Sequence, residues 1–240
     1  MSSSKNFDGL RVLITGGTSG LGLALVQSLT ARGANVAFVA RTASSVERTA
    51  RSTGAHGIVG DVGRKDDIDR IALQAAGMLG GVDILINNAS SLGFVPLSLL
   101  ADTQYEALEK ALDVNVVGPF RLTKALLGAL VSSAHQLRGA VVVNISSDAA
   151  VNPYPTWGAY GASKAALRHL TAIWGEEMAA EGVWFLPFDP GDMDTPLHAL
   201  AVPDADPTTL KRPETAAAEL IDAIGALLPK RVRPLVGAFG

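Results

Sequence analysis

Residues 10–22 read LRVLITGGTSGLG, an apolar run followed at once by a glycine-rich turn. The run Leu10–Thr15 predicts a buried strand, and Leu21–Arg32 continues with helical periodicity up to Gly33, a residue suited to end a helix. Glycine lets the backbone approach a ligand closely, and a helix N-terminus presents unpaired N–H groups beside a positive dipole end. The turn therefore predicts a pyrophosphate site; without a ligand it would be a tight strand-to-helix connection.

The rest of the chain alternates in the same way between apolar runs and helical patterns. Further strands are predicted at 35–40, 57–60, 82–87, 139–146, 183–189 and 234–236, and helices are clearest at 66–79, 104–130, 159–180 and 215–228. Continuous apolar strands separated by helices predict a parallel sheet with right-handed crossovers. We expect one α/β domain over residues 1–240, a Rossmann-type doubly wound parallel sheet of about seven strands with helices on both faces. The irregular stretch 192–213 is expected to be a substrate lid.

Composition and net charge argue against several classes of function. Of 240 residues, 48% are hydrophobic and 18% charged, and the net charge is −3, which favours a large core and argues against nucleic acid or an anionic membrane as partner. No cysteine is present, so disulfides and thiolate catalysis are excluded. No signal peptide and no run of about 18 apolar residues is recognised, so we expect a cytoplasmic protein without a membrane span. The four histidines are scattered, and no metal site is expected.

The end of the second strand bears on the choice of nucleotide. Nucleotide-binding domains that take NAD usually place an acidic residue there to bind the ribose hydroxyls. This chain has Ala40, Arg41 and Thr42 instead. A guanidinium suits the 2′-phosphate of NADP(H), so NADP(H) is predicted over NAD(H). A solvated surface arginine is the alternative.

A tyrosine and a lysine stand four residues apart at the start of the 159–180 helix. Tyr160 and Lys164 share a helix face, and a nearby ammonium is expected to lower the tyrosine pKa towards a value useful for acid–base catalysis. Asn144–Ser147 ends one predicted strand and Asp189–Thr195 follows the next, so their polar groups should meet the pair at the carboxyl edge of the sheet.

Taken together, these motifs resemble the single-domain form of the short-chain dehydrogenase/reductase family. The resemblance spans almost the whole chain and rests on the turn at 15–22, Asp61-Val62, Asn87-Asn88-Ala89, Asn115, Ser147, Tyr160, Lys164, Pro190-Gly191 and Thr195. It implies an NADP(H)-dependent oxidoreductase that acts as a carbonyl reductase or secondary-alcohol dehydrogenase.

The resemblance also implies a role for each residue. Tyr160 would be the general acid or base, Lys164 would lower its pKa and bind the ribose, Ser147 would orient the substrate oxygen, and Asn115 would hold a water. Cofactor contacts are implied for Gly16, Thr18, Ser19, Gly20, Leu21, Gly22, Arg41, Thr42, Asp61, Val62, Asn88, Ala89, Ser90, Tyr160, Lys164, Pro190, Gly191, Met193 and Thr195.

Other features concern the substrate and assembly. Ser90 stands where the family often has glycine. The predicted substrate pocket is mostly apolar and suggests a ketone or alcohol with a hydrophobic body; it comprises Ser90, Leu92, Phe94, Ser147, Pro153, Trp157, Tyr160, Met193, Leu197 and His198. A homodimer or homotetramer through the helices after the fourth and fifth strands is implied by the family.

Two other classes of protein are alternatives to an oxidoreductase. A serine hydrolase would need a complete nucleophile turn, but Gly161-Ala162-Ser163-Lys164-Ala165 lacks its final glycine and reads as helix. A non-catalytic NADP-binding sensor or scaffold on the same fold is the second alternative, because a fold does not determine a function.

Overall fold

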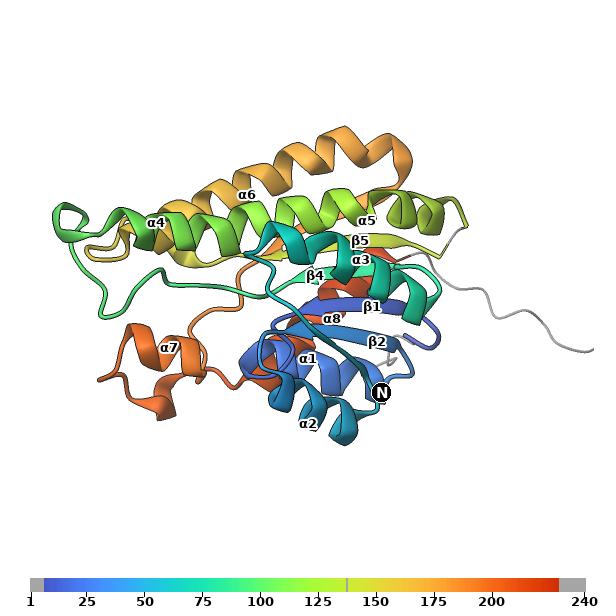
Figure 1. Cartoon of the computed structure of the whole chain (residues 1–240), viewed down its shortest axis with the longest axis horizontal. Helices are drawn as coiled ribbons and strands as arrows, with labels where there is room; N and C mark the ends of the chain where they lie inside the picture. The colour runs from blue at the N-terminus through green and yellow to red at the C-terminus, as the bar shows by residue number, and fades with distance from the viewer. Residues whose placement is uncertain (1–6, 137, 229–240) are drawn as a thin grey trace, which may run out of the picture.

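The computed structural model describes residues 7–136 and 138–228, and its centre is a parallel sheet (Figure 1). Within these residues six strands lie in the order β3-β2-β1-β4-β5-β6. Their bounds are β1 Arg11–Thr15, β2 Asn35–Ala40, β3 His56–Val59, β4 Ile84–Asn87, β5 Ala140–Ile145 and β6 Val183–Phe188. The doubly wound α/β fold is confirmed; the seventh strand predicted at Pro234–Val236 lies outside the described residues.

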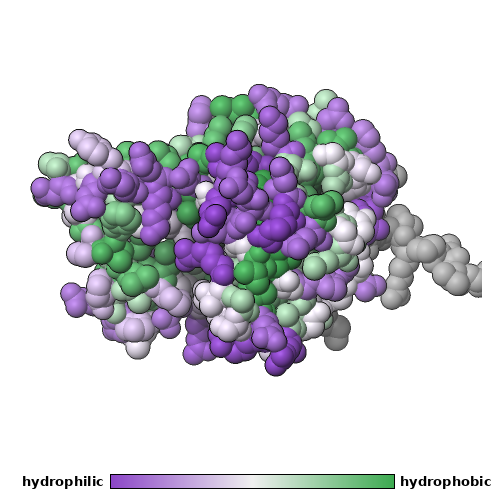
Figure 2. Space-filling model, viewed as in Figure 1, coloured by the Kyte–Doolittle hydropathy of each residue, from purple (hydrophilic) through white to green (hydrophobic). Residues whose placement is uncertain are grey.

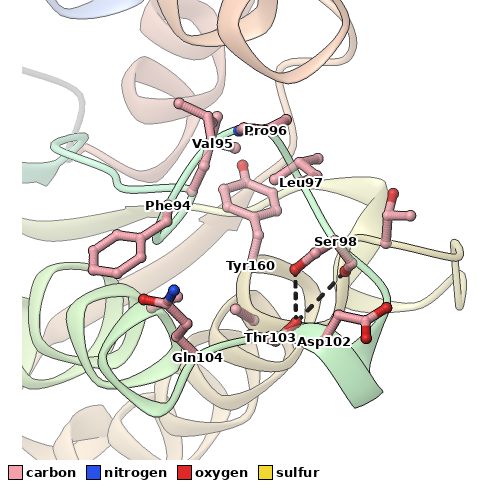
Figure 3. A pocket seen from close by; sticks show the side chains of 13 residues that line it. Phe94, Val95, Pro96, Leu97, Ser98, Asp102, Thr103, Gln104 and Tyr160 are labelled. Atoms are coloured by element: carbon pink, nitrogen blue, oxygen red, sulfur yellow. Dashed lines mark hydrogen bonds between the residues drawn. The ribbon is translucent and has the colours of Figure 1, made fainter.

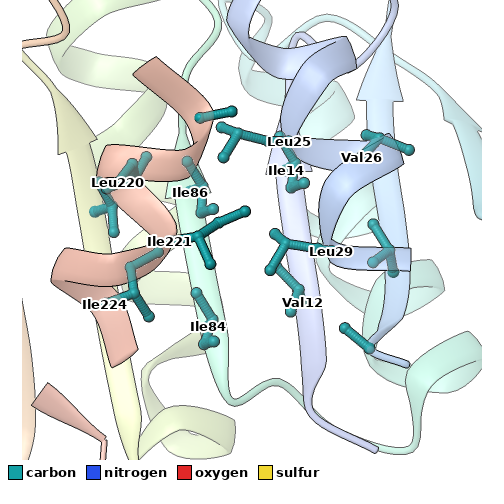
Figure 4. Packing of buried hydrophobic residues seen from close by; sticks show 14 of the residues in the cluster. Val12, Ile14, Leu25, Val26, Leu29, Ile84, Ile86, Leu220, Ile221 and Ile224 are labelled. Atoms are coloured by element: carbon teal, nitrogen blue, oxygen red, sulfur yellow. The ribbon is translucent and has the colours of Figure 1, made fainter. Parts of the chain in front are cut away.

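One face of the sheet is covered by α1 (Gly20–Ala31), α2 (Ala43–Thr53) and α8 (Pro213–Leu227). Val12 and Ile14 of β1 point to this face, and Figure 4 shows Ile14 beside Leu25 and Val12 beside Leu29 of α1. Side chains alternate along a strand, and here both alternating sets are apolar and buried. This is why the strands read as unbroken apolar runs.

The opposite face carries α3 (Lys65–Leu79), α5 (Gly118–His135) and α6 (Gly158–Met178). Leu13, the residue between Val12 and Ile14, belongs to this second core. Leu122, Leu126 and Leu130 of α5 are almost wholly buried against it. The four-residue spacing of these leucines places one helix stripe on the sheet.

The helix predicted at 104–130 is longer and less regular than expected. α4 (Tyr105–Leu112) runs into one π-helical stretch, Asp113–Val117, and then into α5. Among the described residues, Tyr105–His135 is long and apolar enough to span a membrane by length and composition. A core helix meets the same criterion, and α5 packs its leucines on the sheet.

Two other segments differ from or refine the prediction. The helix α2 was not among the predicted elements; its apolar face is small, with Val46 and Thr49 buried. The stretch expected as a lid contains α7 (Pro196–Ala201), which lies at one end of the molecule in Figure 1. Its two ends are joined by a bridge between Met193 and Lys211.

A buried carboxylate links three segments of the chain at the amino ends of the strands. Asp83, just before β4, is fully buried and accepts hydrogen bonds from Arg11 Nε at 3.0 Å, Arg138 Nε at 3.1 Å and Ser133 Oγ at 2.6 Å. Burial alone would raise the pKa of Asp83, but these donors outweigh it and lower the pKa to about 2. The carboxylate is therefore charged at neutral pH and holds β1, β4 and the end of α5 together.

Candidate active site

Hydrogen bonds between polar side chains join the carboxyl ends of the central strands. Asn87 and Asn144 are register partners on β4 and β5, and Asn87 Nδ2 donates to Asn144 Oδ1 at 2.8 Å. Asn144 Nδ2 in turn donates to Thr171 Oγ1 of α6 at 2.9 Å. These buried bonds fix the edge from which the site residues project.

The glycine turn after β1 leaves no room for larger residues. Gly16 and Gly20 have φ of 72° and 50°, where only glycine is unstrained. A Cβ on Gly22 would clash with the Gly16 carbonyl oxygen and lie 2.6 Å from Asn88 Nδ2. Asn88 braces the turn, because its amide donates to the carbonyls of Thr15 at 2.8 Å and Gly16 at 3.2 Å.

The start of α1 fits an anionic group. Ser19 precedes the helix in extended backbone, yet its side chain makes no capping hydrogen bond. The first N–H groups of α1 therefore face the turn without a side-chain acceptor, as a pyrophosphate would require. Ser146 adds a buried hydroxyl that has no partner among the described residues and lines the same cleft. The residues present fit a dinucleotide.

A cleft of about 880 Å³ runs along this edge and brings the two predicted residue sets together. Every residue predicted to contact the cofactor lines it except Gly22, whose place is inside the turn. Arg41 and Thr42 lie where the cleft passes β2, and both are exposed. Thr42 precedes α2 without capping it, so a second helix N-terminus is open beside Arg41.

Tyr160 and Lys164 lie together on the floor of the cleft. The Lys164 Nζ atom is 5.4 Å from the centroid of the Tyr160 ring and donates to the Ile145 carbonyl at 2.8 Å. Burial raises the pKa of Tyr160 to about 12, although hydrogen bonds with Ser147 and Ser90 act to lower it. Burial also lowers the pKa of Lys164 to about 8. The lowered tyrosine pKa expected from the sequence is not found here, because desolvation exceeds the favourable contacts.

Ser147 is held at the end of β5 by its neighbours. Its Oγ accepts from Ala149 N at 3.2 Å and donates to Asp148 Oδ1 at 3.2 Å. The hydroxyl of Tyr154 donates to the other oxygen of Asp148 at 2.6 Å. Asp148 thus connects Ser147 to the loop that leads into α6.

Asn115 lies in the π-helical stretch and is buried beside the site. Its Oδ1 accepts from Ser90 Oγ at 3.1 Å and Ser91 N at 2.7 Å, and its Nδ2 donates to Ser91 O and Ser163 Oγ, both at 2.8 Å. Protein groups therefore use both N–H bonds and both lone pairs of the amide. The side chain thus offers no further donor or acceptor to a water, and the water expected at Asn115 stays a prediction; Asn115 does not line the cleft.

The substrate side of the cleft agrees with most of the predicted pocket. Its lining includes Ser90, Leu92, Ser147, Trp157, Tyr160, Met193, Leu197 and His198. Phe94 instead lines a neighbouring pocket of about 280 Å³, and in Figure 3 its ring points away from Tyr160. Pro153 is exposed and lines neither pocket, so its contact with the substrate stays a prediction. Apolar side chains are exposed at the α7 end of the molecule (Figure 2), among them Val95, Leu200 and Val202.

Several site residues were missed from the sequence. Ser163 is the clearest: it accepts from Asn115 and donates to the Tyr160 carbonyl at 2.6 Å. Its position three residues after Tyr160 on one helix face could have revealed it. Ser91 and Lys110, which line the cleft itself, carried no recognisable signal. Among residues 7–136 and 138–228, no group of three or more acidic or histidine side chains could hold a metal ion.

The family is decided by comparison with known proteins. The family model described as short chain dehydrogenase matches residues 11–206. The chain belongs to this family. As a short-chain dehydrogenase it shares the nicotinamide cofactor typical of the group, which the glycine turn and the open start of α1 fit.

Curated relatives of this short-chain dehydrogenase match in part. "Dehydrogenase/reductase SDR family member 4" from Bos taurus is 34% identical over 188 residues, 76% of this chain and 65% of the relative. The chain thus spans less than two thirds of that protein's length. The 2-(R)-hydroxypropyl-CoM dehydrogenase of Xanthobacter autotrophicus is 33% identical over 193 residues, 77% of this chain and 75% of the relative.

Solved structures are similar over nearly the full chain. A 3-ketoacyl-(acyl-carrier-protein) reductase from Brucella melitensis, complexed with NADH, is 25% identical with a TM-score of 0.83 over 91% of both chains. A short chain dehydrogenase/reductase family protein is 32% identical with a TM-score of 0.81, again over 91% of both.

Proposed function

We propose that this protein is an NADP(H)-dependent oxidoreductase that interconverts a ketone and a secondary alcohol. The observation that carries the proposal is the convergence of Ser147, Tyr160 and Lys164 in one cleft with the glycine turn. A sensor or scaffold would need the nucleotide site but has no use for a buried phenol and ammonium facing the substrate side.

The chain's own groups supply the proton chemistry. When bound, the nicotinamide supplies or accepts the hydride. Tyr160 gives its proton to the carbonyl oxygen in reduction, and a pKa raised to about 12 by burial keeps the phenol protonated for this step at neutral pH. Lys164, held by the Ile145 carbonyl, places its charge beside the developing phenolate. Ser147 positions the substrate oxygen.

The preference for NADP(H) rests on Arg41. Its guanidinium is exposed in the cleft beside the uncapped start of α2, and both features attract a phosphate on the ribose. The similar Brucella reductase was solved with NADH, so the preference calls for direct measurement.

The substrate proposed is a ketone with a hydrophobic body. Leu92, Trp157 and Leu197 line the substrate side and pack around Tyr160, with the Trp157 and Tyr160 rings edge to face at 5.7 Å. The names of two similar proteins, a 2-(R)-hydroxypropyl-CoM dehydrogenase and a 3-ketoacyl reductase, concern the same alcohol and ketone chemistry. Closure of α7 over the substrate is part of this proposal.

Assembly is proposed as a homodimer or homotetramer through α5 and α6. Phe120 and Ile173 are each 40% exposed on these helices, and Phe120 lies 6.0 Å from the Trp174 ring. Sedimentation equilibrium tests this, since a monomeric mass would contradict it. A cytoplasmic location stays a prediction.

The nucleotide is tested by titrating the protein with NADPH and with NADH and following nicotinamide fluorescence. We expect tighter NADPH binding and an Arg41→Ala loss of about 10- to 100-fold, the worth of hydrogen bonds to a charged group. NADH affinity should change little. Arg48→Ala is the matched control, because Arg48 is another exposed arginine, on α2, that does not line the cleft.

Catalysis is tested with a panel of aryl and alkyl ketones and NADPH. Turnover by the parent protein that disappears in Tyr160→Phe would support the proposed oxidoreductase activity. NADPH binding without turnover of any ketone or alcohol would favour the sensor, and binding of neither nucleotide would remove the basis of the proposal.

A further inference from the structure

Ser90 follows Asn87-Asn88-Ala89 at the end of β4, where the family often has glycine. It lines the cleft on the substrate side, half-buried beside Tyr160. A serine in this place adds a hydroxyl within reach of the reacting groups, and its contacts indicate what that hydroxyl does.

The Ser90 hydroxyl lies between Asn115 and Tyr160. Its Oγ donates to Asn115 Oδ1 at 3.1 Å, and its contact with the Tyr160 side chain acts to lower the pKa of that phenol. Asn115 is held in turn by Ser91 and by Ser163, which donates to the Tyr160 carbonyl. The amide that orients Ser90 is therefore fixed to the same helix turn that carries Tyr160.

Ser147 and Ser90 differ in the acceptors that compete for their protons. The Ser147 hydroxyl donates to the charged carboxylate of Asp148. The Ser90 hydroxyl donates to a neutral amide oxygen, and that oxygen keeps a second, shorter bond from Ser91 N at 2.7 Å. Turning the Ser90 proton towards another acceptor thus leaves Asn115 satisfied.

We propose that Ser90 is a second hydroxyl partner of the Tyr160 oxygen and donates to it when Tyr160 becomes a phenolate. This rests on the proposed function. In reduction the Tyr160 O–H bond breaks and a new O–H bond forms on the substrate oxygen, while the hydride of the reduced nicotinamide bonds to the carbonyl carbon. The negative charge remains on the Tyr160 oxygen, and Ser90 turns its O–H towards that charge without losing its proton.

This contact makes the phenolate easier to form. A hydrogen bond to the charged form of an acid lowers its pKa, and the Ser90 contact acts on the pKa of Tyr160 in that direction. Ser147 is then left to the substrate oxygen. The proton moves between the Tyr160 oxygen, which Ser90 contacts, and the substrate oxygen, which Ser147 contacts.

The test is the pH dependence of kcat/KM for alcohol oxidation, in which Tyr160 must be ionised, in Ser90→Ala and Ser90→Gly. We expect the limb assigned to Tyr160 to move up by about one pH unit, so that the rate at a fixed lower pH falls about tenfold. Ser90→Thr, which keeps a hydroxyl at this position, should restore the profile.

Ser91→Ala serves as the matched control. Its hydroxyl lies in the same loop but accepts from Gly93 N at 3.1 Å, so its removal should leave the limb in place. A Ser90→Ala profile that superimposes on the parent's would overturn the proposal, as would an equal shift in Ser91→Ala.

A second measurement separates this inference from the proposed function. The ultraviolet absorbance of the phenolate, taken as the difference from Tyr160→Phe, follows Tyr160 ionisation without any substrate. Ser90→Ala should ionise at higher pH, and circular dichroism should confirm that it is folded. A shifted titration with no turnover would support the Ser90 contact and refute the proposed oxidoreductase activity. An unshifted titration with turnover would support the oxidoreductase activity and refute the Ser90 contact.

Discussion

Replacing Asp83 by asparagine removes the charge that joins three segments at the amino edge of the sheet. The carboxylate is fully buried between Arg11 and Arg138, whose side chains are 16% and 31% exposed. Its pKa falls from 3.8 to about 2 on folding. A carboxyl whose pKa is depressed contributes stability above its unfolded pKa and loses it as pH falls through its folded pKa.

The size of the effect follows from that difference. Each pKa unit corresponds to about 1.4 kcal/mol, so the pH-dependent contribution of Asp83 is about 2 kcal/mol. It should be complete above about pH 4 and disappear towards about pH 2. Asp83→Asn should lose at least this amount near neutral pH, since two arginines would face an amide.

The assay is urea unfolding of parent and variant across that pH range. Glu47→Gln is the control, because Glu47 is also paired with an arginine, Arg51, but their side chains are 63% and 78% exposed; it should change stability little. NADPH affinity should be unaffected, since Asp83 precedes β4 and the cleft lies beyond its other end. A parent protein and an Asp83→Asn variant whose stabilities stay parallel from neutral to acid pH would refute the reasoning.

Three further predictions concern the cleft. Gly22→Ala should weaken NADPH binding by tenfold or more, because its Cβ would clash with the Gly16 carbonyl. Gly77→Ala is the control and should leave NADPH binding unchanged, because a Cβ there meets open space on α3. Fluorescence titration with NADPH compares the two variants. Ketone reduction should decline as pH rises through about 8, where Lys164 loses its charge, and a profile flat well above that pH would argue against this role. Trp157→Ala should alter the ranking of ketones by kcat/KM more than Phe94→Ala, and equal rankings in all three proteins would contradict the assigned pocket wall.

The fold and the cofactor turn could be predicted because their signals are local. Apolar runs mark strands buried on both faces, and the spacing of Gly16, Gly20 and Gly22 meets a backbone requirement that few other sequences satisfy. Helix α2 was missed because its sequence is polar and only Val46 and Thr49 are buried. The π-helical stretch at 113–117 leaves the apolar pattern almost unchanged, so periodicity could not reveal it.

The site was predicted as a set of residues but not as a network. Tyr160 and Lys164 follow from spacing, whereas the pKa of each depends on how deeply the fold buries it, which spacing does not tell. The partners of Asn115 come from two separate segments, the loop after β4 and helix α6, and their assembly is a tertiary property. Phe94 was predicted as a wall of the main cleft, yet the loop directs it into the neighbouring pocket, where Lys110 lies over its ring.

The bridge between Met193 and Lys211 gives the α7 segment a closed neck. Asp194 N donates to Lys211 O at 3.0 Å, and Lys211 N donates to Asp192 O at 2.9 Å, so the chain leaves and re-enters the body of the protein at one point. A loop tied at its base can lengthen or shorten at a small entropic cost without disturbing what lies below it. Residues 196–210 are therefore an exchangeable part: new substrates can be explored by rewriting them while Met193 and Thr195, the predicted cofactor contacts at the base, are kept.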